Sequence, residues 1–391
     1  MRLFRARACW LLLVAATTVA VSGAGCAPTG VSSAPSNASV ADVLVGPSAD
    51  SLLVGDSQQL MALSRDARGR PVTGRDISWT SLNPEIATVS ATGVVSGQAA
   101  GTARIMATSE GKSGAAVMTV LPTRQDTAEC DAPRPGWSWC DDFEKDRLSS
   151  YFQYAPVDGG FVRRPGAGYG GSVGMRARFS RKGQVQAGFL HIAIGKTPSP
   201  YFRPVDAGTA RYREIYWRHL IKFQAGWIGA GGNKMSRAQV IVNTRWAQAM
   251  IGHVWSGIIS EGEPYRLGLA PASGTDESGT VRTTEYNDFA RFRWLGTAWS
   301  RTPIFDQMHV GKWYCIEAHA RLNDPGRSNG IFELSINGAP EARVDRLNWQ
   351  GGYSDYGINT VFLENYWNDG SPQPQERYFD NFIVSTQRIG C

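Results

Sequence analysis

The stretch VFLENYWNDGSPQPQERYFDNFIVST, residues 361–386, carries the pattern that decides the fold of the larger part of the chain. Val361–Asn368 alternates aromatic and polar side chains, as a strand does when its two faces meet different surroundings. A Gly-Ser-Pro-Gln-Pro turn follows, and Tyr378–Ser385 has the composition of a second strand. We therefore predict a hairpin that closes one β-sandwich running from Cys130 to Cys391.

Composition points to a chain with two packed domains and an uneven distribution of aromatic residues. The chain has 391 residues, and eleven of its thirteen Trp lie after Cys130. Some of these rings must form a core, and the others are available to stack on a ligand. From Asp131 onward, 30 Lys and Arg face 25 Asp and Glu, and most of these cations are Arg, which suits carboxylate or sulfate. No basic run or known nucleic-acid motif occurs, so we expect no nucleic-acid partner.

The N-terminus has the features of a secretion signal. Met1–Arg7 is basic, an apolar stretch follows, and small residues precede Cys26, so residues 1–25 are predicted to be a signal too short to span a membrane. The pattern resembles a bacterial lipoprotein signal, which implies that Cys26 is lipidated, although Gly23 stands where the family has a branched residue. The alternative is ordinary secretion. Residues 26–40 are rich in Ser, Pro, Ala and Gly and are predicted to be a tether. We expect contact with a membrane only through the lipid.

Cysteine usage agrees with export. Apart from Cys26 and a cysteine in the signal, the chain has Cys130, Cys140, Cys315 and Cys391. Four cysteines allow three pairings, and the sequence does not choose among them. We expect two structural disulfides in an oxidising compartment, and no zinc site because no Cys-x-x-Cys spacing is present.

Residues 41–122 contain about seven short alternating runs separated by turn residues, which predicts an immunoglobulin-like sandwich. The segments VGDSQQLMA (54–62), ISWTSLNPEIATVSATGVVSGQAAGTARIMATS (77–109) and AAVMTVLP (115–122) resemble the bacterial immunoglobulin-like group 2 family. The resemblance implies a surface spacer or adhesive module with Trp79 in its core. Residues 123–129 are predicted to be a linker.

Residues 130–391 show short strands and Gly-rich turns. In the clearest strand, Arg213–Phe223, Trp217 and Ile221 share one face while Tyr216 and Lys222 share the other. This pattern predicts a two-sheet sandwich or jelly roll. The resemblance is to concanavalin-A-like jelly rolls, and among them to heparin-lyase-like polysaccharide lyases. It rests on four segments: WCDDFE (139–144), WIGAGGNKM (227–235), WYCIEAHARLNDPGRSNGIFELSINGAPE (313–341) and FLENYWNDG with RYFDNFIVST (362–386).

A lyase acting on a uronate polymer needs a group that neutralises the carboxylate, a base that removes the C5 proton, and an acid for the leaving oxygen. By this resemblance we expect Arg218 or Gln239 to neutralise, Lys234 or His253 to be the base, and Tyr366 to be the acid. Lys234 is preferred because a Gly-Gly-Asn-Lys loop is an unusual place for a structural lysine. The residues expected to bind the substrate are Glu364, Asn365, Trp367, Asn368 and Tyr216.

The histidines other than His253 carry less weight. His191, His219 and His319 lie in strand-like apolar runs, where a hydrogen-bonded structural role is expected. Glycoside hydrolysis is a weaker alternative, because the Glu-x-Asp-x-x-Glu run of laminarinase-type jelly rolls is absent.

A calcium site is a further expectation. The first and last strands of such a jelly roll lie side by side, so Glu144, with Asp142, can approach Asp380. In related carbohydrate-binding jelly rolls the matching positions hold calcium, and hard oxygen ligands suit it. The alternative is that these acids are solvated or paired with Arg377. No organic cofactor is expected.

Taken together, the sequence predicts an exported monomer with an immunoglobulin-like spacer followed by a concanavalin-A-like jelly roll. The expected partner is an extracellular, acidic polysaccharide, which the jelly roll binds and cleaves by β-elimination. The rival hypotheses are a non-catalytic, lectin-like binding module and a purely structural surface protein.

Overall fold

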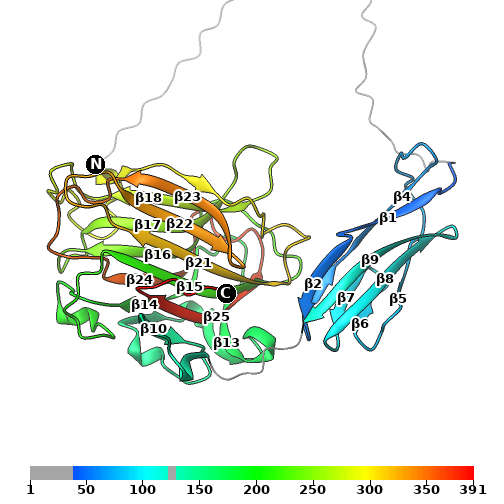
Figure 1. The fold of residues 1–391 in the computed structure, drawn as a ribbon, viewed down its shortest axis with the longest axis horizontal. Helices are drawn as coiled ribbons and strands as arrows, with labels where there is room; N and C mark the ends of the chain where they lie inside the picture. Colours follow the sequence, from blue (N-terminus) through cyan, green and yellow to red (C-terminus); the bar gives the residue numbers. More distant parts are fainter. Residues whose placement is uncertain (1–37, 122–128) are drawn as a thin grey trace, which may run out of the picture.

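The computed structural model describes residues 38–121 and 129–391. The predicted signal, the lipidation site at Cys26 and nearly all of the predicted linker lie outside these residues. Figure 1 shows two β-sheet bodies, a smaller one built from β1–β9 and a larger one built from β10–β25. The described residues contain no α-helix, which confirms the predicted all-β fold, and no helix among them is long and apolar enough to cross a membrane.

The smaller body is a sandwich of short strands around an apolar core. Its strands are β1 (Asp42–Gly46), β2 (Ala49–Leu53), β3 (Ser57–Gln59), β4 (Met61–Arg65), β5 (Ser78–Ser81), β6 (Ala87–Val89), β7 (Val94–Gly97), β8 (Gly101–Ser109) and β9 (Lys112–Leu121). They form the sheets β1-β4, β2-β9-β8-β5 and β3-β7-β6. Trp79 packs against the core, as predicted. A Cβ on Gly93, whose φ is +84°, would come within 2.8 Å of the Trp79 ring, so this turn requires glycine.

The larger body consists of two stacked eight-stranded sheets. The first, here the β25 sheet, has the order β12-β13-β25-β15-β21-β22-β23, with β10 also beside β25. Its strands are β10 (Trp137–Asp141), β12 (Phe161–Pro165), β13 (Val173–Phe179), β15 (Glu214–Phe223), β21 (Trp313–Arg321), β22 (Gly330–Ile336), β23 (Ala339–Leu347) and β25 (Gln375–Ser385). The pairing of β10 with β25 confirms that the first and last strands are neighbours.

The second sheet, here the β24 sheet, has the order β11-β14-β24-β16-β17-β18-β19, with β20 also beside β18. Its strands are β11 (Gln153–Ala155), β14 (Gln186–Ala193), β16 (Asn233–Ile241), β17 (Gln248–Gly257), β18 (Arg266–Ser273), β19 (Arg293–Trp294), β20 (Ala298–Trp299) and β24 (Thr360–Trp367). Short 3-10 turns occur at η1 (Glu129–Asp131), η2 (Leu148–Ser150), η3 (Val157–Gly159), η4 (Tyr169–Gly171), η5 (Pro200–Phe202) and η6 (Phe289–Arg291).

The core lies between the two sheets. On β15 the predicted alternation is confirmed, because Trp217, Ile221 and Phe223 are fully buried in the core while Tyr216 and Lys222 lie on the outer face. Each aliphatic or phenyl side chain buried in this way stabilises the fold by about 1.5–3 kcal/mol. Among the described residues, four tryptophans are fully buried in the core: Trp217, Trp227, Trp349 and Trp367. The remaining described tryptophans are more exposed.

The predicted hairpin is wrong. β24 and β25 are consecutive in the chain, but they belong to different sheets, so their connection crosses from one layer to the other. The backbone of this connection bonds elsewhere: Ser371 N donates to Gln184 O at 2.9 Å, and Gly183 N donates to Ser371 O at 2.8 Å. As a result, the inward side chains of β24 and β25 face each other across the core.

Both predicted disulfides are present, and the structure selects the pairing. Cys130 pairs with Cys140, and Cys315 pairs with Cys391. The second bridge closes a loop of 76 residues and ties the last residue to β21. In the chain-entropy model, a loop of this size stabilises the folded state by about 4 kcal/mol.

The smaller body contacts the outer face of the β25 sheet. Leu53 joins an apolar cluster that includes Leu220 and Trp313. Two ion pairs flank this cluster, one between Lys222 and Asp56 at 3.6 Å and the other between Lys312 and Asp50. Gln58 Nε2 also donates to Met308 O at 2.9 Å. The predicted spacer is therefore docked on the larger domain.

Candidate functional site

The candidate site is on the outer face of the β24 sheet, and alternation along β24 decides which residues reach it. Phe362, Glu364 and Tyr366 point outward. Asn365 and Trp367 point into the core, because successive side chains of a strand face opposite ways. Asn365 Oδ1 accepts a hydrogen bond from Arg377 at 2.7 Å, and the fully buried Trp367 donates from Nε1 to Gly231 O at 3.0 Å. Their predicted contact with a substrate is wrong.

A β-bulge in β16 places Lys234 and Arg237 on the same face. In a regular strand, residues three apart point to opposite faces. Here the register shifts between Lys234 and Ser236 against both β17 and β24. Met235 and Ser236 consequently both point inward: Met235 is in the core, and Ser236 Oγ accepts a hydrogen bond from Trp217 at 3.0 Å. Bulges commonly redirect side chains in this way beside functional sites.

Lys234 lies in a setting that favours its neutral form. Its Nζ is 4.7 Å from the Tyr366 ring centroid and 5.4 Å from that of Phe289. Within residues 38–121 and 129–391, this amine has no hydrogen bond or ion pair. Burial lowers the pKa of Lys234, and the charge of Arg237 lowers it further, while the charge of Glu364 opposes both.

Arg237 and Glu364 form a buried ion pair beside Lys234. Arg237 Nε is 2.7 Å from Glu364 Oε1, and the two side chains are 2% and 8% exposed. The guanidinium also donates to Asn287 Oδ1 at 2.9 Å and to the Tyr286 hydroxyl. Sequence reasoning missed Arg237, because three-residue spacing from Lys234 gave no reason to place both on one face.

Other polar side chains form the floor of this face. Gln239 and Thr360 are opposite each other on β16 and β24 and are fully buried. Neither amide atom of Gln239 nor the Thr360 hydroxyl has a hydrogen-bond partner among the described residues. Buried polar groups are normally paired, so these atoms are where water or a ligand would bind. His253, opposite Arg237 on β17, stays neutral, because burial and the charges of Arg237 and Lys234 hold its pKa well below 6.5.

A row of stacked aromatic rings borders the polar floor. The His253 and Trp255 rings are 5.3 Å apart, and Trp255 and Trp294 are 6.0 Å apart, each pair nearly parallel. Phe289 stacks on Trp294 at 6.3 Å. Trp294 and Phe289 are 45% and 40% exposed, so their faces are open to a ligand. Sequence reasoning missed this row, although the surplus of Trp and the position of His253 close to Trp255 in the sequence pointed toward it.

Two predicted residues lie on the wrong side of the molecule. Arg218 and Tyr216 belong to β15, so they point from the outer face of the opposite sheet. Arg218 pairs with Glu129 and donates to Gly390 O at 3.0 Å. Tyr216 stacks on His319, with ring centroids 4.1 Å apart. Neither residue can act together with Lys234.

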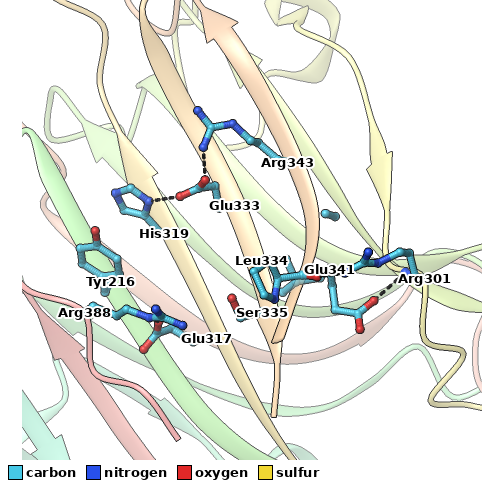
Figure 2. A pocket seen from close by; sticks show the side chains of 12 residues that line it. Tyr216, Arg301, Glu317, His319, Glu333, Leu334, Ser335, Glu341, Arg343 and Arg388 are labelled. Atoms are coloured by element: carbon cyan, nitrogen blue, oxygen red, sulfur yellow. Dashed lines mark hydrogen bonds and ion pairs between the residues drawn. The ribbon is translucent and has the colours of Figure 1, made fainter. Parts of the chain in front are cut away.

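Tyr216 and His319 border a cavity of about 480 Å³ on that opposite face. Figure 2 shows that its charged side chains face one another, with Arg343 reaching Glu333 and His319 bonded to the same carboxylate. Arg388 pairs with Glu317 at 3.6 Å, the Arg301 guanidinium donates to Pro340 O, and Glu341 accepts hydrogen bonds from Thr302. None of the residues that line this cavity has a buried side-chain polar atom without a hydrogen-bond partner, in contrast to Gln239 and Thr360 on the β24 sheet.

Asn368 lies just beyond β24, at the rim of the candidate site. Its backbone N donates to Gly232 O at 3.1 Å, immediately before the strand that carries Lys234. The side chain is exposed, so it remains available to a ligand.

The predicted calcium ligands are only partly brought together. Asp142 is engaged elsewhere, because its carboxylate lies 3.0 Å from Arg147. Asp380 accepts a hydrogen bond from Tyr169 N at 2.7 Å. Burial raises the pKa of Asp380 to about 8, and the charge of Glu144 adds to this effect. No group of three or more potential metal-ligating side chains occurs among the described residues. Calcium stays a prediction, supported by Glu144 and Asp380 alone.

Comparison with known proteins identifies the smaller domain and finds similar folds for the larger one. Residues 39–120 match the model of the bacterial Ig-like domain (group 2). No curated protein matches the sequence. Similar solved structures include alginate lyase Aly36B, with 12% identity over 66% of this chain and 94% of that chain, at a TM-score of 0.43. The endo-β-1,4-glucuronan lyase of the fungus Trichoderma reesei has 11% identity over 64% of this chain and 96% of that chain, at a TM-score of 0.42. The marine PL-14 alginate lyase of Aplysia kurodai has 12% identity over 64% of this chain and 99% of that chain, at a TM-score of 0.43. Likenesses of this strength carry no argument about activity.

Proposed function

We propose that the outer face of the β24 sheet binds an acidic, uronate-containing polysaccharide and cleaves it by β-elimination. One observation carries the proposal: a lysine with a lowered pKa faces a tyrosine beside a buried Arg–Glu pair, and this lysine has no ion-pair partner among the residues that the structure describes. These are Lys234, Tyr366, Arg237 and Glu364. A structural lysine on a sheet surface would extend into solvent or pair with an acid.

The chemistry assigns one role to each side chain. Lys234 in its neutral form removes the C5 proton of a uronate, and a base works best when its pKa lies near the working pH. Arg237 takes the place predicted for Arg218 and stabilises the negative charge that grows on the carboxylate. Tyr366 donates a proton to the leaving O4, so a C4–C5 double bond forms as the C4–O4 bond breaks. Glu364 holds Arg237 in position.

The remaining residues of the face extend the proposed site along the polymer. Gln239 and Thr360 lie farther along the same strands, and because both are fully buried, their unpaired polar atoms would hold water beneath the bound polymer. Trp255, Trp294 and Phe289 would stack on sugar rings. The exposure of this stacked row also favours a second candidate function, a non-catalytic carbohydrate-binding module.

A direct assay separates the two candidates. The purified protein is incubated with alginate, glucuronan, heparin and pectate while the ultraviolet absorbance of unsaturated uronate is followed. We expect absorbance to rise on at least one polymer, and Lys234→Ala to abolish turnover while binding persists. Lys182→Ala, which changes an exposed lysine in a turn outside this face, is the matched control. Binding without absorbance on any polymer would replace the lyase by the binding module.

We further infer that the chain is exported. The observations behind this are the N-terminal signal pattern and the two disulfides, which suit an oxidising compartment. The cell surface or the periplasm follows if Cys26 is lipidated, and secretion follows if it is not. Fractionation of cells producing the chain with Cys26 or with Cys26→Ser distinguishes these two locations.

A further inference from the structure

Arg377 lies fully buried between the two sheets of the larger domain, on the inward face of β25. Its guanidinium has five N–H groups, and each has an acceptor. The contacts are Nε to Asn365 Oδ1 at 2.7 Å, Nη1 to Asn233 Oδ1 at 2.8 Å and to Met235 Sδ at 2.9 Å, and Nη2 to Glu364 O at 2.6 Å and to Lys234 O at 3.1 Å. None of these acceptors is a carboxylate.

Burying an arginine in the core in this way costs free energy. A buried cation without a paired carboxylate loses its hydration, and burial lowers the pKa of Arg377 to about 9. Two of its other neighbours are aromatic rings, since the guanidinium lies 5.4 Å from the Phe379 ring centroid and 5.9 Å from that of Phe179. An apolar residue would suit such a pocket at lower energetic cost. We therefore look for the role of Arg377 in the groups that accept its hydrogen bonds.

The acceptors share one location. Three belong to Asn233, Lys234 and Met235 on β16, and two belong to Glu364 and Asn365 on β24. All are at the point where the register between these strands shifts. A bulge interrupts the regular ladder of hydrogen bonds, so its backbone groups need partners from elsewhere. Arg377 reaches this point from the opposite sheet and binds directly behind Lys234 and Glu364.

We propose that Arg377 is a positioning residue for the candidate site: its guanidinium fixes the bulge that turns Lys234 and Arg237 to the same face and sets Lys234 opposite Tyr366. The inference rests on the proposed function, because Lys234 is the group whose position matters. Arg377 touches neither substrate nor reacting atoms, and it acts through the backbone of the two strands. Its fork of five donors is what a lysine lacks, since a single ammonium cannot span acceptors on two strands.

The kinetic test uses Arg377→Lys in the full chain. Displacement of a catalytic group by about 1 Å reduces catalysis about 100-fold, so we expect kcat to fall by about that factor while KM changes little. The matched control is Val384→Ala, a fully buried core position on the same strand and away from the bulge. The control should lower the melting temperature without lowering kcat. A folded Arg377→Lys protein with wild-type kcat would overturn the proposal.

A second measurement does not depend on activity. The titration midpoint of Lys234, followed by NMR of isotope-labelled lysine side chains, should move toward that of surface lysines in Arg377→Lys. An unchanged midpoint in the folded variant overturns the positioning role even if the wild type cleaves no polymer. Conversely, a shifted midpoint with an inactive wild type overturns only the proposed function.

A milder variant covers the case in which Arg377→Lys does not fold. Asn233→Ala removes one acceptor of Nη1 and leaves the guanidinium in place. We expect a smaller loss of kcat and a smaller shift of the Lys234 midpoint, both in the same directions. A wild-type kcat together with a wild-type midpoint in Asn233→Ala contradicts the proposal.

Discussion

At the scale of single residues, the properties of Lys234 result from a competition between burial and one negative charge. Loss of hydration disfavours the ammonium form, and this is the larger effect. The Glu364 carboxylate favours the ammonium form, but its charge is largely committed to Arg237 at 2.7 Å. The balance leaves a lysine whose pKa lies below its ordinary value, as a catalytic base requires.

The charge of Glu364 gives a prediction for the pH profile. Only neutral Lys234 can accept a proton, so kcat should rise with pH along a limb that reports the lysine pKa. Because Glu364 raises that pKa, Glu364→Gln should move the limb to lower pH. The measurement is kcat against pH for the wild type, Glu364→Gln and Glu277→Gln, the last an exposed acid outside this face. A limb that moves to higher pH in Glu364→Gln contradicts the assignment of Lys234.

Glu144 and Asp380 give a prediction for metal binding. Burial favours the protonated form of Asp380, and repulsion from the Glu144 carboxylate favours this form further. A calcium ion between them would reverse both effects, so calcium at pH 8 should raise the melting temperature. Glu144→Gln should remove this increase, whereas Asp355→Asn, an exposed acid, should retain it. An unchanged melting temperature of the wild type in calcium would eliminate the site.

At the scale of elements, the strands of the larger domain follow from alternation, but their partners do not. The alternation of β15 and the strands within residues 361–386 could be predicted from the sequence, because the side-chain period of a strand is two. The sequence did not predict that the chain passes from one sheet to the other between β24 and β25, because Gly-Ser-Pro-Gln-Pro suits a hairpin as well as a connection between layers. The turn is decided by Gly183 and Gln184, almost 190 residues away.

The bulge in β16 limited the prediction of the site in the same way. Lys234, Gln239, His253 and Tyr366, which the sequence analysis named as candidates, lie together on strands of the β24 sheet. Arg237 was missed because nothing in the local sequence shows that Met235 and Ser236 both turn inward. That turn depends on a tryptophan and an arginine from the opposite sheet, which no local pattern contains.

The hydrogen bond that anchors the bulge gives an element-scale prediction. Ser236→Ala leaves the buried Trp217 N–H without its acceptor, which should reduce the free energy of unfolding by about 1–3 kcal/mol. Denaturant unfolding measures the change. Ser335→Ala, on the outer face of β22, is the control and should change stability by less than about 0.5 kcal/mol. Equal effects for both substitutions would contradict the anchoring role of Ser236.

At the scale of the whole molecule, the smaller domain and the candidate site occupy opposite sides of the larger sandwich. The smaller domain contacts the β25 sheet, where burial raises the pKa of Asp56 beside Lys222. The candidate site faces outward from the β24 sheet. Docking therefore leaves the site open to a long polymer. It also gives the two domains a defined arrangement, in contrast to a spacer on a flexible linker.

The docked arrangement can be tested by reversing the charges that flank the contact. Lys222→Glu combined with Lys312→Glu places like charges opposite Asp56 and Asp50. We expect the radius of gyration from small-angle X-ray scattering to increase, while kcat on the preferred polymer stays at the wild-type level. Lys112→Glu combined with Lys182→Glu, at two exposed lysines outside the contact, controls for the change in net charge. An unchanged radius of gyration for the double variant would mean that these ion pairs do not hold the domains together.

The central claim is that the outer face of the β24 sheet cleaves a uronate polymer by β-elimination. Mass spectrometry of the products formed in water labelled with oxygen-18 tests this claim most directly. Elimination adds no water, so the account predicts oligosaccharides with unsaturated, unlabelled ends that are one water lighter than hydrolysis products, and their loss in Lys234→Ala. Saturated products that have gained one heavy oxygen for each bond cleaved, or the same unsaturated products from Lys234→Ala, would contradict it.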